Sequence, residues 1–186
     1  MTKYILHGGR TSDKNPGNEC FFREITSELK GDIKILLNYF TRGKNDWEKL
    51  AKQDKTNFLQ QSEQNDIKFT IARKKNFVKE IKNSHVLYFR GGNPFLLLEK
   101  LKQISNLENY FQNRVIAGSS AGAHILSRYF YSKVKHRVGK GLGILNIKIC
   151  CHHSSKSVNI IRKLKRYKED LPILALPEYK TVVLYK

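Results

Sequence analysis

Residues 115–124 hold the pattern in this chain that is most typical of chemistry. A short apolar run stops at Gly118, and small residues then place Ser120 between Gly118 and Gly122 in a G-x-S-x-G arrangement. This spacing is typical of a nucleophile elbow, a tight strand-to-helix turn that exposes a serine hydroxyl. The first amides of the helix then face whatever binds beside the serine, so the amide of Ala121 is one candidate oxyanion donor. The same residues also fit a plain flexible loop, and the pattern alone leaves both interpretations open.

A second glycine turn, Gly-Gly-Asn-Pro at residues 91–94, lies one predicted strand earlier. It follows the apolar run 85–89 and precedes a helix predicted for 95–104, in whose first turn Pro94 fits. Glycines allow the backbone to approach a ligand, and a second oxyanion N–H would have to originate in this region. Taken alone, such a sequence is most often only a turn at the start of a helix.

Strands and helices alternate along the chain. Strands are predicted at 3–7, 32–40, 67–71, 85–89, 115–117 and 147–151, and helices at 18–30, after Asn45, at 77–81, 95–104 and 157–169. The alternation predicts a flavodoxin-like three-layer α/β/α sandwich with a mostly parallel sheet. The apolar runs 173–176 and 181–185 predict a C-terminal β-hairpin that bends at Pro177. Ligands collect at the carboxyl ends of parallel strands, where the glycines at 8–9, 91–92 and 118–122 all fall.

Length and composition indicate the kind of protein. With 186 residues, of which 40% are hydrophobic, we expect a single domain over residues 1–186. No apolar run approaches the roughly 20 residues of a membrane span, and the first residues show no signal-peptide pattern. The three cysteines make no disulfide framework, which indicates a reducing compartment. We therefore expect a cytoplasmic protein that does not bind membranes, and leave open whether it is a monomer or a homodimer.

The charge balance is strongly basic, with 35 Lys and Arg against 16 Asp and Glu and a formal net charge of +19. Such a balance raises the hypothesis of a nucleic-acid-binding module. However, the lysines are scattered over the predicted helices and loops, and no aromatic-interleaved stripe gathers them. A lysine-rich composition explains the charge more simply, so nucleic-acid binding is kept only as an alternative.

Two histidines follow the strand predicted for 147–151. Side chains alternate along a strand, so only one of His152 and His153 can face a given side, and the sequence does not decide which. For the same reason the four residues 150–153 cannot converge on a zinc ion, and no C-x-x-C or H-x-x-x-H spacing occurs. We expect neither a metal nor a cofactor. Glu178 is the one carboxylate at the predicted hairpin tip, a position where glutamates are usually solvated and idle.

Several segments together resemble the dipeptidase E family. They are Gly-Gly-Asn-Pro at 91–94, Gly-Ser-Ser-Ala-Gly-Ala at 118–123, Gly-Leu-Gly-Ile-Leu at 141–145, Ile-Cys-Cys-His at 149–152 and Ala-Leu-Pro-Glu at 175–178. The family comprises aspartyl dipeptidases and the related cyanophycinases, which are serine peptidases on a fold shared with class I glutamine amidotransferases. The resemblance implies a hydrolase that works through an acyl-enzyme, whereas an amidotransferase-like protein that binds a small amide or peptide without cleaving it is the nearest alternative.

The resemblance also implies roles for individual residues. Ser120, His152 and Glu178 match the serine, histidine and acidic residue of a catalytic triad. The amides of Gly92 and Ala121 match the oxyanion hole.

The family acts on acidic substrates, and a protein of net charge +19 attracts anionic ligands. A small acidic peptide, with aspartate at its amino terminus, is therefore the expected substrate. Arginine holds a carboxylate best, and Arg10, Arg90 and Arg162 lie in or near the predicted site. Arg90 is the first choice for this contact, with Asn93 in the adjoining turn.

Overall fold

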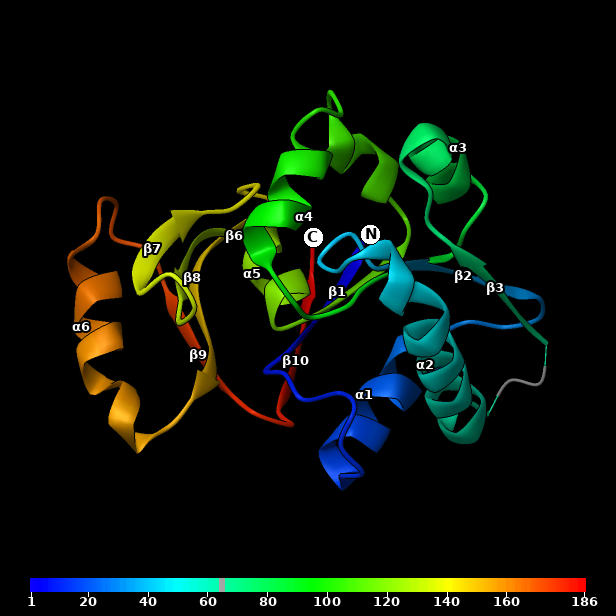
Figure 1. Ribbon diagram of the computed structural model, residues 1–186, viewed down its shortest axis with the longest axis horizontal. Coiled ribbons are helices and arrows are strands. Elements are labelled where there is room, and N and C mark those ends of the chain that lie inside the picture. The colour runs from blue at the N-terminus through cyan, green and yellow to red at the C-terminus, as the bar shows by residue number, and fades with distance from the viewer. Residues whose placement is uncertain (64–65) are drawn as a thin grey trace.

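The computed structural model describes residues 1–63 and 66–186, which fold into two β-sheets flanked by helices (Figure 1). The strands are β1 (Lys3–His7), β2 (Ile33–Asn38), β3 (Ile67–Ile71), β4 (Val86–Phe89), β5 (Val115–Ser119), β6 (Ser127–Ser132), β7 (Arg137–Lys140), β8 (Leu145–His153), β9 (Ile173–Pro177) and β10 (Thr181–Tyr185). The α-helices are α1 (Pro16–Thr26), α2 (Trp47–Gln61), α3 (Phe77–Lys82), α4 (Pro94–Leu101), α5 (Ala121–Leu126) and α6 (Val158–Arg166). Short 3-10 helices are η1 (Lys44–Asp46), η2 (Lys74–Asn76), η3 (Leu107–Phe111) and η4 (Ser155–Ser157).

The larger sheet has six strands in the order β10-β1-β5-β4-β2-β3. The five strands from β1 to β3 in this order run parallel, and only β10 is antiparallel, pairing with β1. The carboxyl ends of β1, β4 and β5 therefore meet at one edge of the sheet. The three glycine-bearing turns found in the sequence all follow these strands.

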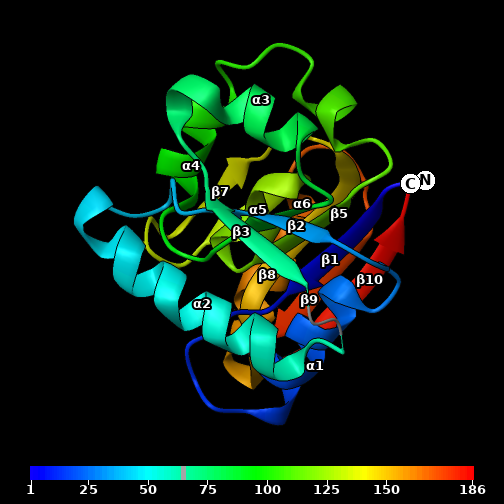
Figure 2. The same ribbon diagram turned by 90° about the vertical axis from the view of Figure 1, so that its right-hand side faces the viewer.

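Each face of this sheet is covered by helices (Figure 2). On one face α1 and α2 pack against strand side chains such as Ile35 and Tyr88. On the other face α3, α4 and α5 pack against the alternate side chains, such as Leu36 and Phe89. Burial of both faces explains why every residue of the inner strands β4 and β5 is buried. The predicted three-layer α/β/α sandwich with a mostly parallel sheet is confirmed.

The sequence pattern did not predict the second sheet, which has four strands in the order β7-β6-β8-β9 and carries α6 (Figure 1). Helix α5 is six residues long, or about 9 Å at the rise of an α-helix. It is too short to carry the chain to an edge of the first sheet, because β5 is already paired on both sides, with β1 and β4. Strand β6 therefore begins directly after α5 and starts a new sheet.

The two C-terminal strands do not form the predicted hairpin. Strand β9 pairs in parallel with β8 in the second sheet, whereas β10 pairs antiparallel with β1 in the first. A hairpin would have left the outer edges of β1 and β8 without backbone partners. The turn between β9 and β10 instead contacts the turn after β1, where the amide of Gly8 donates to the carbonyl of Lys180 at 2.9 Å. Glu178 thus lies where the chain crosses from one sheet to the other.

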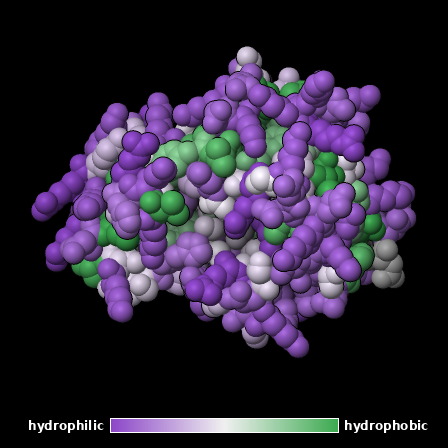
Figure 3. Space-filling view, in the orientation of Figure 1, coloured by the Kyte–Doolittle hydropathy of each residue, from purple (hydrophilic) through white to green (hydrophobic). Residues whose placement is uncertain are grey.

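Hydrophilic side chains cover most of the face seen in Figure 3, with groups of hydrophobic residues between them. No helix in the described part of the chain is long and apolar enough to cross a membrane.

Candidate active site

Ser120 lies in the tight turn between β5 and α5. Its φ of 49° and ψ of −104° are a strained conformation for a residue that carries a side chain. The amide of Ser120 donates to the carbonyl of His7 at 2.9 Å, which ties the turn to the end of β1. A Cβ added at Gly118 would lie 2.5 Å from the carbonyl carbon of Gly122, so this close approach requires glycine. The strand-to-helix turn that the G-x-S-x-G pattern predicts is present.

His152 meets Ser120 from the end of β8. The pairing of β8 with β9 shifts register at this residue, and the φ of His152 is 54°, as in a β-bulge. The bulge places the ring over Gly9, where an added Cβ would lie 2.3 Å from Cε1 of His152. Nε2 of His152 then lies 2.8 Å from Oγ of Ser120. The structure brings His152, and not His153, to the serine.

Glu178 continues this chain of hydrogen bonds. Its Oε1 lies 2.9 Å from Nδ1 of His152, and its Oε2 lies 2.8 Å from Nε of Arg10. Partial burial works to raise the pKa of the Glu178 carboxyl, but the hydrogen bonds with His152 and Arg10 outweigh it and hold that pKa below its usual value. The carboxylate is therefore ionised at neutral pH.

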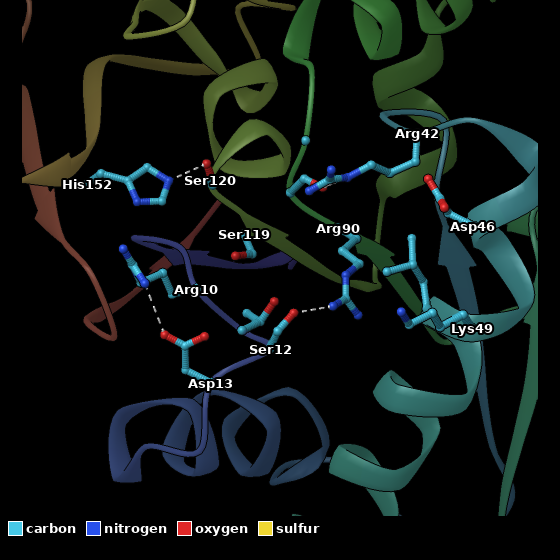
Figure 4. A pocket seen from close by; sticks show the side chains of 14 residues that line it. Arg10, Ser12, Asp13, Arg42, Asp46, Lys49, Arg90, Ser119, Ser120 and His152 are labelled. Atoms are coloured by element: carbon cyan, nitrogen blue, oxygen red, sulfur yellow. Dashed lines mark hydrogen bonds and ion pairs between the residues drawn. The ribbon is translucent and has the colours of Figure 1, made fainter.

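A cleft of about 480 Å³ opens beside Ser120 (Figure 4). Figure 4 shows Ser120 and His152 on one side of the cleft and Arg42, Lys49 and Arg90 on the other. The glycine turn after β4 also lines it, and a Cβ on Gly91 would lie 3.4 Å from Cβ of Ser120.

Gly92 lines the cleft beside Ser120, and Ala121 is the residue that follows Ser120 in the chain. Across the described residues, the amides of Gly92 and Ala121 donate no hydrogen bond to another protein group. Gly92 has a φ of 154°, a conformation that side chains rarely allow, and Ala121 is the first residue of α5. Two free N–H groups near a serine hydroxyl are the parts from which an oxyanion hole is built.

Arg90 does not extend into the cleft as a free cation, contrary to the expectation that it binds a substrate carboxylate. Its guanidinium pairs with the buried carboxylate of Asp54 on α2, and its Nη2 donates to Ser12 and Gln53, each at 2.7 Å. The side chains of Arg90 and Asp54 are 4% and 0% exposed. Burial raises the pKa of Asp54, and the charge of Arg90 opposes that rise. The guanidinium that was expected to hold a substrate carboxylate is thus already bonded inside the protein.

Asn93 and Arg162 also lie away from the expected substrate contact. The Oδ1 of Asn93 caps α4 by accepting the amide of Phe95 at 3.0 Å. Arg162 is exposed on α6, which packs on the second sheet. Among the described residues, the lining of the cleft includes Arg90 and Gly92 but neither Asn93 nor Arg162.

Arg42 and Lys49 line the cleft but were not identified from the sequence. Arg42 lies in the loop after β2, four residues beyond its last residue, and Lys49 lies in the first turn of α2. A position in the loop at the carboxyl end of a parallel strand is a signal that favours Arg42. In a chain with 35 Lys and Arg, however, charge alone does not distinguish these two residues from the others.

Two further histidines are buried near the site. His7 accepts the amide of Gly9 at 3.1 Å, and His124 accepts the amide of Cys151 at 3.3 Å. Burial, with a smaller contribution from His152, lowers the pKa of His7 to about 4 and that of His124 to about 3. Both rings are neutral at physiological pH and support the turns around Ser120. Over residues 1–63 and 66–186, no group of three or more His, Cys, Asp or Glu side chains could hold a metal ion.

A serine in a strained strand-to-helix turn, bonded to a histidine that is bonded in turn to a carboxylate, is the arrangement of a serine hydrolase. The sequence profile of Peptidase family S51 matches residues 41–186. The chain therefore belongs to peptidase family S51, the dipeptidase E family, and is a serine-type peptidase.

Solved structures share the fold. A peptidase from an acI-B1 Actinobacterium superimposes with a TM-score of 0.70 at 20% identity, over 99% of this chain and 83% of that one. A putative peptidase E protein from Listeria monocytogenes EGD-e gives a TM-score of 0.68 at 17% identity, over 99% and 94% of the two chains. No curated protein sequence matches the chain.

Proposed function

We propose that this peptidase hydrolyses small acidic peptides through a triad of Ser120, His152 and Glu178 and an acyl-enzyme. The observation that carries the proposal is the unbroken hydrogen-bonded chain from Oγ of Ser120 through the imidazole to the carboxylate, with contacts of 2.8 and 2.9 Å.

The mechanism follows from these contacts. Nε2 of His152 takes the proton of Ser120 as the hydroxyl attacks the peptide carbonyl, and later gives it to the leaving amine. Glu178 fixes the imidazole tautomer through Nδ1 and stabilises the imidazolium that forms. The amides of Gly92 and Ala121 stabilise the negative oxygen of the tetrahedral intermediate. Water then hydrolyses the acyl-enzyme by the same proton transfers.

Two of the charged side chains that line the cleft, Arg42 and Lys49, support an acidic substrate. Nε of Arg42 donates to the carbonyl of Gly91 at 3.2 Å, and in the described structure no protein group bonds its two terminal nitrogens or the ammonium of Lys49. Figure 4 shows Arg42 extending toward Ser120. We assign to Arg42, in place of Arg90, the forked contact with the carboxylate of an amino-terminal aspartate.

A fluorophosphonate probe tests the nucleophile, because only an activated serine reacts with it. Ser120→Ala should abolish labelling and lower turnover about a million-fold, with little change in melting temperature. Ser119→Ala is the matched control and should keep both labelling and turnover. A labelled, active Ser120→Ala variant would exclude the proposed triad.

Dipeptide kinetics test the substrate. Asp-Leu should be hydrolysed faster than Ala-Leu or Lys-Leu, and Arg42→Ala should remove most of that advantage. The advantage should shrink toward 0.5 M salt, where the Debye length is roughly 4 Å. Equal rates at low salt would refute the acidic substrate and leave the serine mechanism intact.

A further inference from the structure

We propose that Arg10 is a positioning residue that holds Glu178 in line with His152 during catalysis. This inference rests on the proposed triad, since it assigns a role to the second oxygen of its carboxylate.

The two oxygens of Glu178 are divided between two partners. Oε1 faces Nδ1 of His152 at 2.9 Å, while Oε2 faces Nε of Arg10 at 2.8 Å. The Glu178 side chain is 34% exposed and projects from a turn, so one hydrogen bond to the imidazole would leave the carboxylate free to rotate. A second contact on the opposite oxygen removes that rotation.

The loop after β1 is built to hold Arg10 in this place. Arg10 has a φ of 65°, which a residue with a side chain adopts only where the surroundings enforce it. The Nδ2 of Asn18 donates to the carbonyl of Arg10 at 2.8 Å, and the Gly9 amide before it donates to Nδ1 of His7 at 3.1 Å. The Nη1 of Arg10 also donates to Asp13 at 3.4 Å.

Asp13 makes a second bridge from this loop to the turn that carries Glu178. Its carboxylate accepts the hydroxyl of Tyr179 at 2.8 Å, and the amide of Tyr179 donates to the carbonyl of Gly9 at 3.4 Å. The loop 8–13 and the turn 178–180 are therefore bonded to each other at several points, one of which is the Arg10–Glu178 contact.

The effect of Arg10 is on orientation more than on charge. Its side chain is 55% exposed, so solvent and salt screen its repulsion of the imidazolium that forms on His152. A misplaced catalytic partner, by contrast, costs up to about a hundredfold in rate. Loss of Arg10 should therefore lower kcat and leave KM for a neutral substrate unchanged.

The experiment compares Arg10→Ala and Arg10→Lys with the natural chain on Ala-Leu. We expect Arg10→Ala to lower kcat about ten- to a hundredfold. Arg10→Lys should recover part of the loss, and millimolar guanidinium ion should restore activity to Arg10→Ala, because the site is open to solvent. Arg128→Ala is the matched control: it removes another exposed arginine, hydrogen-bonded to Glu169 at 3.1 Å on the second sheet, and should leave kcat unchanged.

A double-mutant cycle tests whether Arg10 acts through the carboxylate of Glu178. In a Glu178→Gln background, Arg10→Ala should cause no further loss of kcat, because no carboxylate remains for Arg10 to hold against Nδ1 of His152. Equal losses of kcat in both backgrounds would overturn the proposal. It would also be overturned if Ser120→Ala inactivates the protein but Arg10→Ala keeps the kcat of the natural chain. A rise in KM for Asp-Leu alone would make Arg10 a substrate ligand and also overturn it. Failure of the triad itself would appear separately, as an active Ser120→Ala variant.

Discussion

Replacing Arg90 by methionine tests whether this arginine serves the fold or the substrate. The Arg90→Met variant leaves the carboxylate of Asp54 buried, with the hydroxyl of Tyr39 at 2.9 Å and no compensating charge. Breaking a buried ion pair on one side costs about 3–5 kcal/mol. The entropy of unfolding is about 2.1 cal/mol/K per residue, or roughly 0.4 kcal/mol/K for 186 residues. The melting temperature should therefore fall by about 8–13 °C.

The loss should also depend on pH. Without Arg90, the pKa of Asp54 in the folded state rises further above its value in the unfolded chain, because burial is no longer opposed. The folded variant then binds an extra proton as pH falls, so its stability recovers toward pH 5 relative to the natural chain. Thermal unfolding at pH 8 and pH 5, followed by circular dichroism, measures the difference.

Two comparisons complete the test. The double variant Arg90→Met with Asp54→Asn should melt higher than Arg90→Met alone, because the unpaired charge is gone while the amide oxygen still accepts from Tyr39. Arg90→Met should also keep the preference for Asp-Leu over Ala-Leu. A variant that melts like the natural chain yet loses this preference would show that Arg90 binds the substrate and that the structural assignment is wrong.

Three further predictions follow from the site. His152→Ala should lower kcat on Ala-Leu about a million-fold, whereas His153→Ala should keep most activity; the reverse order would move the general base to His153. Glu178→Gln should keep the melting temperature and lower kcat about 10⁴-fold, and an unchanged rate would return Glu178 to the role of an idle turn residue. The pKa values of His7 and His124 are lowered in the folded chain to about 4 and about 3. Below pH 6.5 these histidines are therefore protonated in the unfolded chain but still neutral in the folded chain, which lowers stability. Each histidine should therefore cost about 2 kcal/mol of stability at pH 5 relative to pH 7, and a His7→Asn variant that shows the same acid sensitivity in urea titrations would contradict this.

Local patterns in the sequence predicted most elements of the first sheet. The strands expected at 3–7 and 67–71 have those bounds in the structure, and the strand expected at 85–89 begins one residue later. The turn at Ser120 was also predicted as one of two interpretations, and the structure selects the strand-to-helix elbow over the flexible loop. Each of these features depends on residues that are close together in the sequence, so it can be predicted from one sequence alone.

Features that depend on distant partners were not predictable. Arg90 was expected to be available to substrate because it ends a strand, but its partner Asp54 lies 36 residues earlier on a helix. Nothing around Asp54 marks it as buried. The hairpin prediction was wrong for a similar reason. Two apolar runs with a turn between them favour pairing with each other, yet β10 pairs with β1 and β9 pairs with β8. The unpaired edges of other strands decided the topology.

The choice between the two histidines shows how such long-range effects reach the site itself. Alternation along a strand predicts that the rings of His152 and His153 face opposite sides. It does not predict which of the two rings meets Ser120. The bulge at His152 decides this, and the bulge exists where the turn after β9 leaves the second sheet to join the first. That crossing also brings Glu178 to His152 and to Arg10. The failed hairpin and the assembled site therefore have one cause, because a hairpin tip would have kept Glu178 away from the carboxyl ends of β1 and β5.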